Sequence, residues 1–287
     1  MPNLEADHAA RVVGYYRKPE SRLSYRLMMG GTRHFGYYPV GSSGLSMAAA
    51  MRLMEDQLGA ALDLPPGSRV LDAGCGEGGV AVRLGTRFGL EVDGVDLLEG
   101  SLERARRTAA RLGLTGSLRF HRLDYADLAF ADQTFDGAYT IETLVHAFDH
   151  RRALAELRRV LKPGGTLALF EYSVPPREQM TRAQRDLFDF VVERSAMRSL
   201  PWFVHGGFPA ILDQAGFEAV TVQDVTQRIW PMLRRLARIC SLPAQAGRLL
   251  GGRGVLLNCT ALVEGYRHRE GWRYNVVTAR RPDGQPP

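Results

Sequence analysis

From residue 69 onward, short apolar runs alternate with amphipathic stretches in which apolar residues recur every three or four positions. Such runs are typical of strands buried in a sheet, and such stretches are typical of helices that pack on it. We predict the first five strands at residues 69–74, 90–96, 117–124, 135–142 and 166–173. Helices are predicted between them at residues 78–88, 101–113 and 151–162. This alternation indicates an α/β fold with a parallel sheet and helices on both of its faces.

The regular alternation is absent before residue 65 and loosens after residue 173. In the C-terminal part we predict helices at 178–197 and 206–215, a strand at 217–225, a mainly helical insertion at 228–266 and a last strand at 272–280. In the N-terminal part we predict helices at 8–30, with a break near Pro19, and at 45–62, on either side of an aromatic loop at 34–44. The C-terminal insertions and the N-terminal segment are expected to cap the carboxyl edge of the sheet, where open α/β sheets bind ligands.

The length of 287 residues and a hydrophobic content of 45% allow a sizeable core. We expect one structural domain in three consecutive parts. These are an N-terminal helical and aromatic segment (1–64), a cofactor-binding core (65–174), and the rest of the sheet with cap insertions at about 175–205 and 228–266 (175–287).

The formal net charge is +6, and the only lysines are Lys18 and Lys162, so the basic residues are mostly arginines. They form no long run; a cluster such as residues 234–238 has the spacing of a solvated helix face. A basic balance permits nucleic acid, a membrane surface or an anionic substrate and selects none of them. We interpret it as an ordinary basic surface.

Cys75, Cys240 and Cys259 are scattered, with neither metal-ligand spacing nor a disulfide pattern, which favours a reducing compartment. The N-terminus lacks the apolar core of a signal peptide, and no apolar run is long enough to span a bilayer. We therefore expect a cytoplasmic protein without a membrane span or a bound metal. A homo-oligomer is left open.

Gly74, Gly76 and Gly79 spell G-x-G-x-x-G between the first predicted strand and the helix that follows it. Glycines at such a turn let a ligand approach the backbone closely, because no Cβ stands in the way. Asp96 follows Gly76 by 20 residues, at the end of the second predicted strand, where a carboxylate can accept both hydroxyls of a ribose. These features fit NAD and S-adenosylmethionine equally well.

Three further features favour S-adenosylmethionine, with S-adenosylhomocysteine as the product. Asp72 can order the glycine loop and face, directly or through water, a ligand ammonium group, which a dinucleotide lacks at this place. Asp124 ends the third predicted strand, where a carboxylate can accept from the adenine amine. Residues 159–171 (RVLKPGGTLALFE) predict a helix, a tight turn and a strand that extends the sheet.

With these motifs in order, residues 69–172 resemble a class I S-adenosylmethionine-dependent methyltransferase. The resemblance implies a Rossmann-like fold with a seven-stranded, mostly parallel sheet, helices on both faces and a mainly helical cap. Residues 14–39, 141–149 (IETLVHAFD) and 261–282 are also similar to the sterol C-methyltransferase and tocopherol methyltransferase group. Arg17 and Met29 depart from that group, which commonly has aspartate and tryptophan there, and these departures bear on the substrate.

The resemblance also implies roles for single residues. Gly74 and Gly76 would line the methionine portion of the cofactor, and Asp96 would bind its ribose. Around the adenine and over the cofactor it implies contacts from Tyr16, Leu97, Asp124, Tyr125 and Ile141. Glu142 and His146 would stand at the end of the fourth strand, near the reacting methyl group.

A sulfonium methyl group is already activated, so the enzyme must mainly place a nucleophile in line and exclude water. A hydroxyl nucleophile needs a base, whereas methylation of an alkene carbon produces a carbocation that aromatic faces or a carboxylate can stabilise. Glu142, His146 and His34 are the catalytic candidates. A position at the cofactor edge for His146 and a structural hydrogen bond for His34 are the alternatives.

Aromatic residues concentrate between Tyr15 and Tyr38 and recur around residue 202. Substrate contacts are predicted for Tyr25, Phe35, Tyr38 and Trp202, and Met180, Phe188 and Met197 are candidates for the same chamber. Packing in an N-terminal cap or a helical core explains these residues equally well.

The cap and the aromatic segment predict a hydrophobic small-molecule substrate of specialised metabolism, with C-methylation of an alkene or prenyl/terpenoid-type carbon favoured. O- or N-methylation of a phenol, sugar or alkaloid is the alternative. Methylation of nucleic acid is disfavoured, because residues 141–144 (IETL) replace the N-P-P-Y type motif of exocyclic-amine methylation. Other rivals are an inactive cofactor-binding scaffold, disfavoured by the intact glycine loop and Asp96, and an NAD oxidoreductase.

Overall fold

The computed structural model describes residues 4–18, 32–42, 44–251 and 256–284. Its centre is a seven-stranded sheet in the order β3-β2-β1-β4-β5-β7-β6. The strands are β1 (Arg69–Ala73), β2 (Glu91–Asp96), β3 (Leu118–Arg122), β4 (Phe135–Ile141), β5 (Leu161–Ser173), β6 (Glu218–Asp224) and β7 (Arg273–Arg280). Neighbouring strands from β3 to β5 pair in parallel, and β7 is antiparallel to both β5 and β6. The predicted seven-stranded, mostly parallel sheet is confirmed.

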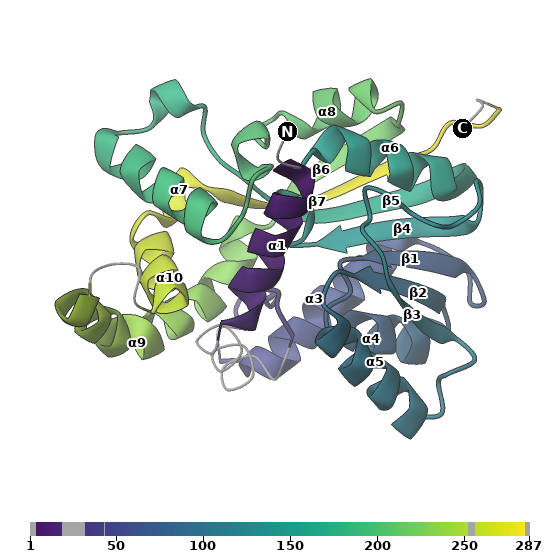
Figure 1. Ribbon diagram of the computed structural model, residues 1–287, viewed down its shortest axis with the longest axis horizontal. Helices are drawn as coiled ribbons and strands as arrows, with labels where there is room; N and C mark the ends of the chain where they lie inside the picture. Colours follow the sequence, from purple (N-terminus) through teal and green to yellow (C-terminus); the bar gives the residue numbers. More distant parts are fainter. Residues whose placement is uncertain (1–3, 19–31, 43, 252–255, 285–287) are drawn as a thin grey trace.

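The helices are α1 (Leu4–Arg17), α3 (Met47–Leu62), α4 (Gly79–Phe88), α5 (Glu99–Arg111), α6 (His150–Val160), α7 (Arg182–Arg194), α8 (Phe208–Gln214), α9 (Thr226–Gly251) and α10 (Leu257–Arg267). One face of the sheet is covered by α3, α4 and α5, and the other by α6 and α8 (Figure 1). Beyond the carboxyl edge of the parallel strands lie α7, α9 and α10, and α1 crosses between this cap and the sheet. The arrangement places a helical cap where ligands bind in open α/β sheets.

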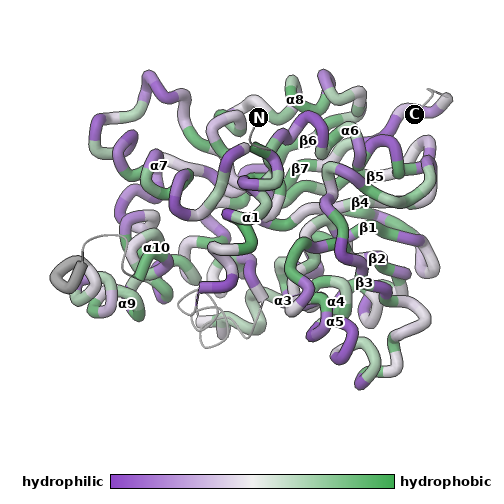
Figure 2. Tube along the Cα trace, viewed as in Figure 1, coloured by the Kyte–Doolittle hydropathy of each residue, from purple (hydrophilic) through white to green (hydrophobic). Residues whose placement is uncertain are grey.

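Alternate residues of the central strands enter two separate cores. On β5, Leu167 and Leu169 pack with the core under α6 and α8, whereas Ala168 and Phe170 pack with the core under α3 and α4. This alternation follows from the two-residue period of a strand. The surface helix α5 is largely hydrophilic outside its buried stripe (Figure 2), as expected for a helix with one face against the sheet.

Three element boundaries differ from the sequence prediction for local reasons. Helix α1 ends at Arg17, because a proline at position 19 disfavours helical backbone before it; the rest of the predicted 8–30 helix lies outside the described residues. Helix α6 ends at Val160, where Leu161 begins to pair with Phe135. Helix α9 continues through two internal prolines and fills most of the predicted insertion.

The segment after β7 ties the sheet to α6 through the fully buried Arg281. Its guanidinium donates hydrogen bonds to the carbonyl oxygens of Arg158 (3.2 Å), Arg159 (3.1 Å) and Leu161. A cation at the end of a helix also interacts favourably with the helix dipole. Among the described helices, including the 26-residue α9, none combines the length and the apolar character that crossing a membrane requires.

Candidate active site

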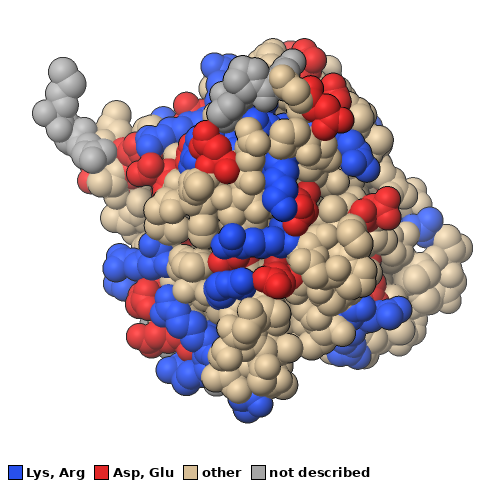
Figure 3. All heavy atoms as spheres, turned by 90° about the vertical axis from the view of Figure 1, so that its right-hand side faces the viewer, with Lys and Arg blue, Asp and Glu red and all other residues tan. Residues whose placement is uncertain are grey.

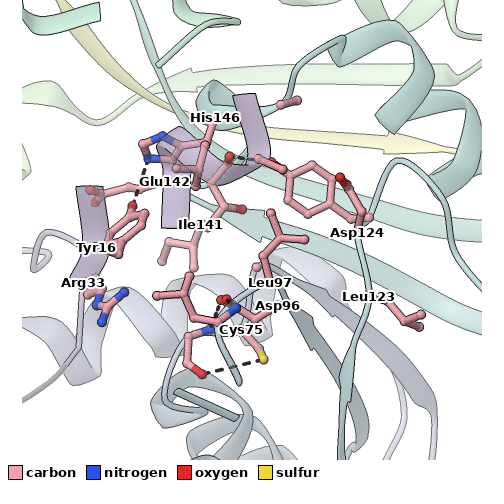
Figure 4. A pocket seen from close by; sticks show the side chains of 18 of the residues that line it. Tyr16, Arg33, Cys75, Asp96, Leu97, Leu123, Asp124, Ile141, Glu142 and His146 are labelled. Carbon is pink, nitrogen blue, oxygen red and sulfur yellow. Dashed lines mark hydrogen bonds between the residues drawn. The ribbon is translucent and has the colours of Figure 1, made fainter. Parts of the chain in front are cut away.

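A first cavity lies at the carboxyl ends of β1, β2 and β4, and α1 closes it (Figure 4). Its walls come from the glycine loop, from the segments that follow β2, β3 and β4, and from one face of α1. The residues that line it include Tyr16, Arg33, His34, Gly74, Gly76, Asp96, Leu97, Leu123, Asp124, Tyr125, Ile141, Glu142, Thr143 and His146. Most of the cofactor residues predicted from sequence are thus brought to one place.

The glycine loop leaves backbone open to this cavity. Gly74 (φ +93°) and Gly76 (φ +54°) both adopt left-handed backbone, which disfavours other residues. A Cβ added at Gly76 would have no heavy atom within 4 Å, whereas a Cβ at Gly74 would lie 2.7 Å from the Thr143 side chain. Gly74 is therefore needed for close packing, and Gly76 leaves its backbone open to the cavity.

Two carboxylates are fixed at the rim of the cavity by backbone groups. Asp96 accepts hydrogen bonds from the amides of Gly76 (2.9 Å) and Leu98 (2.8 Å), and Asp124 accepts one from the amide of Ala126 (2.8 Å). Burial raises the pKa of Asp96, and these two amide hydrogen bonds oppose the shift. Each carboxylate keeps further acceptor positions, so the cavity offers two oriented acceptors.

Apolar groups stand beside these acceptors. Leu97, Leu123 and Ile141 line the same space, and Tyr125 is held in place by a hydrogen bond from its hydroxyl to the carbonyl oxygen of Thr143 (2.9 Å). Acceptors next to flat and aliphatic surfaces match a ribose and a purine. The fixed acceptors, the apolar surfaces and the open glycine backbone therefore fit an adenosine group.

Tyr16 on α1 and His146 after β4 form a hydrogen bond across the cavity, 2.9 Å from the Tyr16 hydroxyl to His146 Nε2 (Figure 4). His146 Nδ1 lies 3.2 Å from the carbonyl oxygen of Ala196. Burial lowers the pKa of His146 to about 4, and the charges of His8 and Arg33 add to the effect. The imidazole is therefore neutral near pH 7, and both of its nitrogens have protein partners.

A second, larger cavity of about 260 Å³ adjoins the first and is mostly apolar. It lies between the end of β5, α7, α9 and α10. Its lining includes Tyr15, Arg33, Phe35, Glu142, Tyr172, Met180, Gln184, Leu187, Phe188, Val191, Ser195, Met197, Leu200, Leu233, Leu236, Asn258, Ala261, Leu262, His268 and Trp272. We call the two spaces the cofactor cavity and the apolar cavity.

Glu142 lines both cavities. It directly follows β4, with a left-handed backbone (φ +57°), and its carboxylate points away from Asp96 and Leu97 (Figure 4). The carboxylate accepts hydrogen bonds from the Phe35 amide (2.6 Å), the Tyr274 hydroxyl (3.0 Å) and the Tyr172 hydroxyl. Burial raises the pKa of Glu142, and the Tyr172 and Phe35 hydrogen bonds oppose the shift. A partly buried carboxylate is thus held at the junction of the two spaces.

Known proteins match both the core and nearly the whole chain. The profile of the methyltransferase domain family matches residues 70–165. The S-adenosyl-L-methionine-dependent Diels-Alderase iccD of Talaromyces variabilis is 36% identical over 274 residues, which are 93% of this chain and 94% of that protein. The chain belongs to the S-adenosylmethionine-dependent methyltransferases.

Two further comparisons agree with this. The methyltransferase GfsG of Streptomyces halstedii is 32% identical to this methyltransferase over 225 residues, which are 78% of this chain and 79% of that protein. The crystal structure of the [4+2]-cyclase SpnF superposes with a TM-score of 0.77 at 23% identity and covers 96% of this chain and 97% of that one. The likeness to SpnF shows the Rossmann-like methyltransferase fold. The cofactor of the family is S-adenosylmethionine, as predicted.

Of the cofactor residues predicted for this methyltransferase, Asp72 is the one that does not line the cofactor cavity. It is buried beneath the glycine loop at the end of β1, and one of its carboxylate oxygens is without a hydrogen-bond partner among the described residues. Burial raises its pKa to about 7. Asp72 therefore does not face the cavity directly, and its ordering of the glycine loop and a water-mediated contact with a ligand ammonium remain predictions. The individual cofactor contacts of the other residues remain predictions.

The three catalytic candidates all line the cofactor cavity, and Glu142 alone among them also lines the apolar cavity. His34 is buried, with Nδ1 2.9 Å from the carbonyl oxygen of Phe35 and Nε2 3.4 Å from a Glu55 carboxylate oxygen. Burial lowers its pKa, but Glu55, the Phe35 carbonyl group and Glu142 together raise it overall. His34 and His146 line the cofactor cavity and not the apolar one, so neither is placed as a base for an acceptor there. Glu142 is the candidate that faces both spaces.

The predicted substrate residues separate in the structure. Phe35, Met180, Phe188 and Met197 line the apolar cavity. Tyr38 lines neither cavity, because it is buried against α3 and α9, and Trp202 is 58% exposed beside His150 on another surface. Both predictions are corrected. Tyr25 lies outside the described residues.

Sequence reasoning missed Arg33, Tyr172 and Trp272. Arg33 lines both cavities, and its guanidinium lies 4.7 Å from the centre of the Tyr16 ring. Tyr172, at the end of β5, and Trp272, directly before β7, meet beside Glu142 with ring centres 5.8 Å apart. In an antiparallel pair, the end of one strand lies beside the start of the other. The positions of Tyr172 and Trp272 at these two places could therefore have indicated that both residues lie at the same edge of the sheet.

Proposed function

We propose that this enzyme transfers a methyl group from S-adenosylmethionine to a carbon atom of a hydrophobic small molecule held in the apolar cavity. The position of Glu142 is the observation that carries the proposal, because this carboxylate faces both cavities. The sequence motifs similar to the sterol C-methyltransferase and tocopherol methyltransferase group agree with carbon as the acceptor.

The character of the apolar cavity supports the substrate class. Its walls are mainly aliphatic, aromatic and methionine side chains, and the cap helices α7, α9 and α10 stand around it. Such a site favours a bulky apolar molecule, because burying apolar surface contributes about 25 cal/mol per Å². A polymer would not fit inside it. Besides Arg33 and Glu142, the polar side chains along the wall include Gln184, Ser195, Asn258 and His268, which can orient a single functional group of the substrate.

The aromatic rings next to Glu142 suit a reaction that passes through a cation. The cofactor supplies a methyl group on a positively charged sulfur, which keeps the electron pair of the broken bond. The acceptor double bond provides the electrons of the new carbon–carbon bond, and the positive charge remains on the substrate. Phe35, Tyr172 and Trp272 can stabilise such a charge by about 0.5–2 kcal/mol for each ring face. An adjacent C–H bond then restores a double bond, and its proton moves to the Glu142 carboxylate.

Cycloaddition is a second candidate, because a relative that is 36% identical over 93% of the chain bears the name Diels-Alderase. In that reaction the apolar cavity would hold a linear polyene in a folded conformation. The cofactor would complete the wall of the cavity without losing its methyl group. Orienting both reacting ends is a sufficient physical source of acceleration.

One experiment separates these functions. The purified protein is incubated with methyl-deuterated S-adenosylmethionine and a panel of prenyl compounds, sterols, linear polyenes and phenols. We expect release of S-adenosylhomocysteine and a product whose label is on carbon by NMR. A label on oxygen or nitrogen would contradict carbon methylation. An unlabelled isomer of the substrate, formed equally well when S-adenosylhomocysteine replaces the methyl donor, would establish cycloaddition instead.

A further inference from the structure

The net positive charge of this protein is confined to one stretch of the sequence. Between Asp224 and Glu264 the chain contains six arginines, no lysine and no acidic residue. The other 31 of the 37 basic residues equal the 31 acidic residues of the chain, so the remainder has no net charge. The stretch of six arginines corresponds to α9, residues 252–255 and the first half of α10.

The described outer face of α9 combines these charges with exposed aliphatic side chains. Arg234, Arg238 and Leu242 follow each other at intervals of four residues, so they line up along one side of the helix. Leu242 is 74% exposed, and Ile239 next to it is 54% exposed. Arg234 and Arg238 are exposed and make no ion pair with a described residue. We call these four residues the α9 face.

The opposite side of α9 is buried in the protein. Met232 and Leu236 are fully or almost fully buried, and Leu233 and Leu236 form part of the wall of the apolar cavity. The helix therefore separates the apolar cavity from a basic and apolar outer surface. By contrast, the side of the molecule away from α9 shows basic and acidic side chains next to one another (Figure 3).

We propose that the α9 face binds the surface of an anionic lipid bilayer, with α9 lying in the plane of the interface. Arginines near an anionic surface contribute about 1 kcal/mol each, and aliphatic side chains beside them enter the boundary between headgroups and acyl chains. Surface binding of this kind needs no membrane-spanning helix. Where the proposed function holds, it also places the apolar cavity one helix away from the phase in which hydrophobic acceptors dissolve.

Other partners fit the α9 face less well. A second copy of the chain would bring its arginines against the same arginines, and like charges at an interface are unfavourable. Nucleic acid would match the arginines but would leave Ile239 and Leu242 without an apolar environment. A lipid surface satisfies both kinds of side chain at once.

Co-sedimentation of the full-length protein with vesicles tests the proposal. Vesicles of phosphatidylcholine alone are compared with vesicles in which about one lipid in four is phosphatidylglycerol, at low and high salt. We expect binding to the anionic vesicles that is at least about tenfold tighter than to the neutral ones and that weakens with salt. Equal binding to both, or binding to neither, would overturn the proposal.

Matched variants locate the contact. The double variant Arg234→Glu/Arg238→Glu is expected to lose vesicle binding, and Ile239→Ser/Leu242→Ser to weaken it by about tenfold. The control is Arg107→Glu/Arg111→Glu on α5, which reverses two exposed arginines with the same spacing and the same change in net charge. Calorimetry with S-adenosylhomocysteine verifies that each variant is folded. An equal loss in the control would show that net charge alone is responsible and would overturn the assignment to α9.

Two further measurements test whether the α9 face binds nucleic acid or a second copy of the chain instead. A short DNA duplex added to the wild-type protein tests nucleic acid, and sedimentation velocity without lipid tests self-association. Binding to the duplex without binding to vesicles would assign the face to nucleic acid. A change of oligomeric state in Arg234→Glu/Arg238→Glu without vesicle binding by the wild type would assign it to a second copy. Either result would overturn the proposal of a lipid surface.

Discussion

The cofactor cavity and the apolar cavity share Glu142 and Arg33 but are built in different ways. The cofactor cavity consists of loops at strand ends, and its acceptors Asp96 and Asp124 are fixed by backbone amides. The apolar cavity is formed by the inner faces of α7, α9 and α10 together with the end of β5, and most of its wall has no polar group. The first space therefore offers a ligand positioned acceptors, and the second offers it shape and apolar area.

This difference has a consequence for specificity. Loops at the ends of a sheet keep their geometry because the sheet fixes both of their ends, whereas helix faces exchange side chains at little structural cost. We therefore infer that the cofactor cavity is the more constrained of the two and that changes in the apolar cavity alter the substrate. Substitutions in one cavity should leave binding in the other nearly unchanged, except at the shared residues.

The largest effect is expected at Glu142, where the two cavities meet. Glu142→Gln keeps an acceptor for the Phe35 amide but removes the carboxylate that we propose takes the proton from the substrate. We expect kcat to fall about 1000-fold with the best acceptor of the panel, while the affinity for S-adenosylhomocysteine changes less than about threefold. The exposed Glu178→Gln is the matched control. A kcat within about tenfold of the wild type would show that Glu142 is not the proton acceptor.

A second test concerns the cofactor cavity alone. The Asp96 carboxylate accepts hydrogen bonds from two backbone amides and lines the cofactor cavity. Asp96→Asn replaces one of the two accepting oxygens with an NH₂ group, which donates hydrogen bonds. Because hydrogen bonds to a charged acceptor contribute about 1.5–3 kcal/mol each, the affinity for S-adenosylhomocysteine should fall about 100-fold in calorimetry. Asp127→Asn, an exposed aspartate three residues after Asp124, should bind as the wild type does. A loss below about threefold would refute the assigned role.

The same contrast explains how much could be predicted from the sequence. The glycine loop, Asp96 and Asp124 belong to short segments whose spacing from a strand end fixes their place, so residues predicted from spacing lie together. Trp202 and Tyr38 were predicted from residue type, which does not state whether an aromatic ring faces a cavity, the core or solvent. Asp72 has the right spacing, but the direction of its side chain beneath the loop depends on packing around β1.

The cap illustrates the remaining limit. Its helices were expected between residues 228 and 266, but Pro231 and Pro243 lie inside one continuous helix, α9, which packs against α10. Tertiary packing there outweighs the local preference of proline to end a helix. The wall of the apolar cavity depends on how α7, α9 and α10 meet, and no short sequence pattern encodes that contact.

A third prediction uses the apolar cavity alone. Leu262→Trp adds a large side chain to the wall contributed by α10 and reduces the space for a ligand. We expect a neutral hydrophobic dye such as Nile red to bind about tenfold more weakly, which corresponds to about 1.4 kcal/mol. The affinity for S-adenosylhomocysteine should stay the same, because Leu262 does not line the cofactor cavity. Leu242→Trp, on the exposed side of α9, is the control. Equal loss of both ligands would mean that the two cavities are not independent.

The smallest effect concerns the neutral Tyr16–His146 contact that closes the cofactor cavity. The pKa of His146 is about 4 in the folded protein and about 6.5 in the unfolded chain. Between these pH values the unfolded chain binds more protons than the folded protein. The free energy of unfolding therefore decreases as the pH falls through this window, and above the window His146 does not affect its pH dependence.

In urea titrations, His146→Gln should flatten this decrease by about 1 kcal/mol per pH unit between about pH 6 and pH 5. Asp72 and Glu171, whose burial raises their pKa values to about 7 and about 8, titrate with the opposite sign, but they are present in both proteins and cancel in the difference. Parallel stability curves for the two proteins would mean that His146 titrates normally, and the wall facing the cofactor would then become charged under mildly acidic conditions.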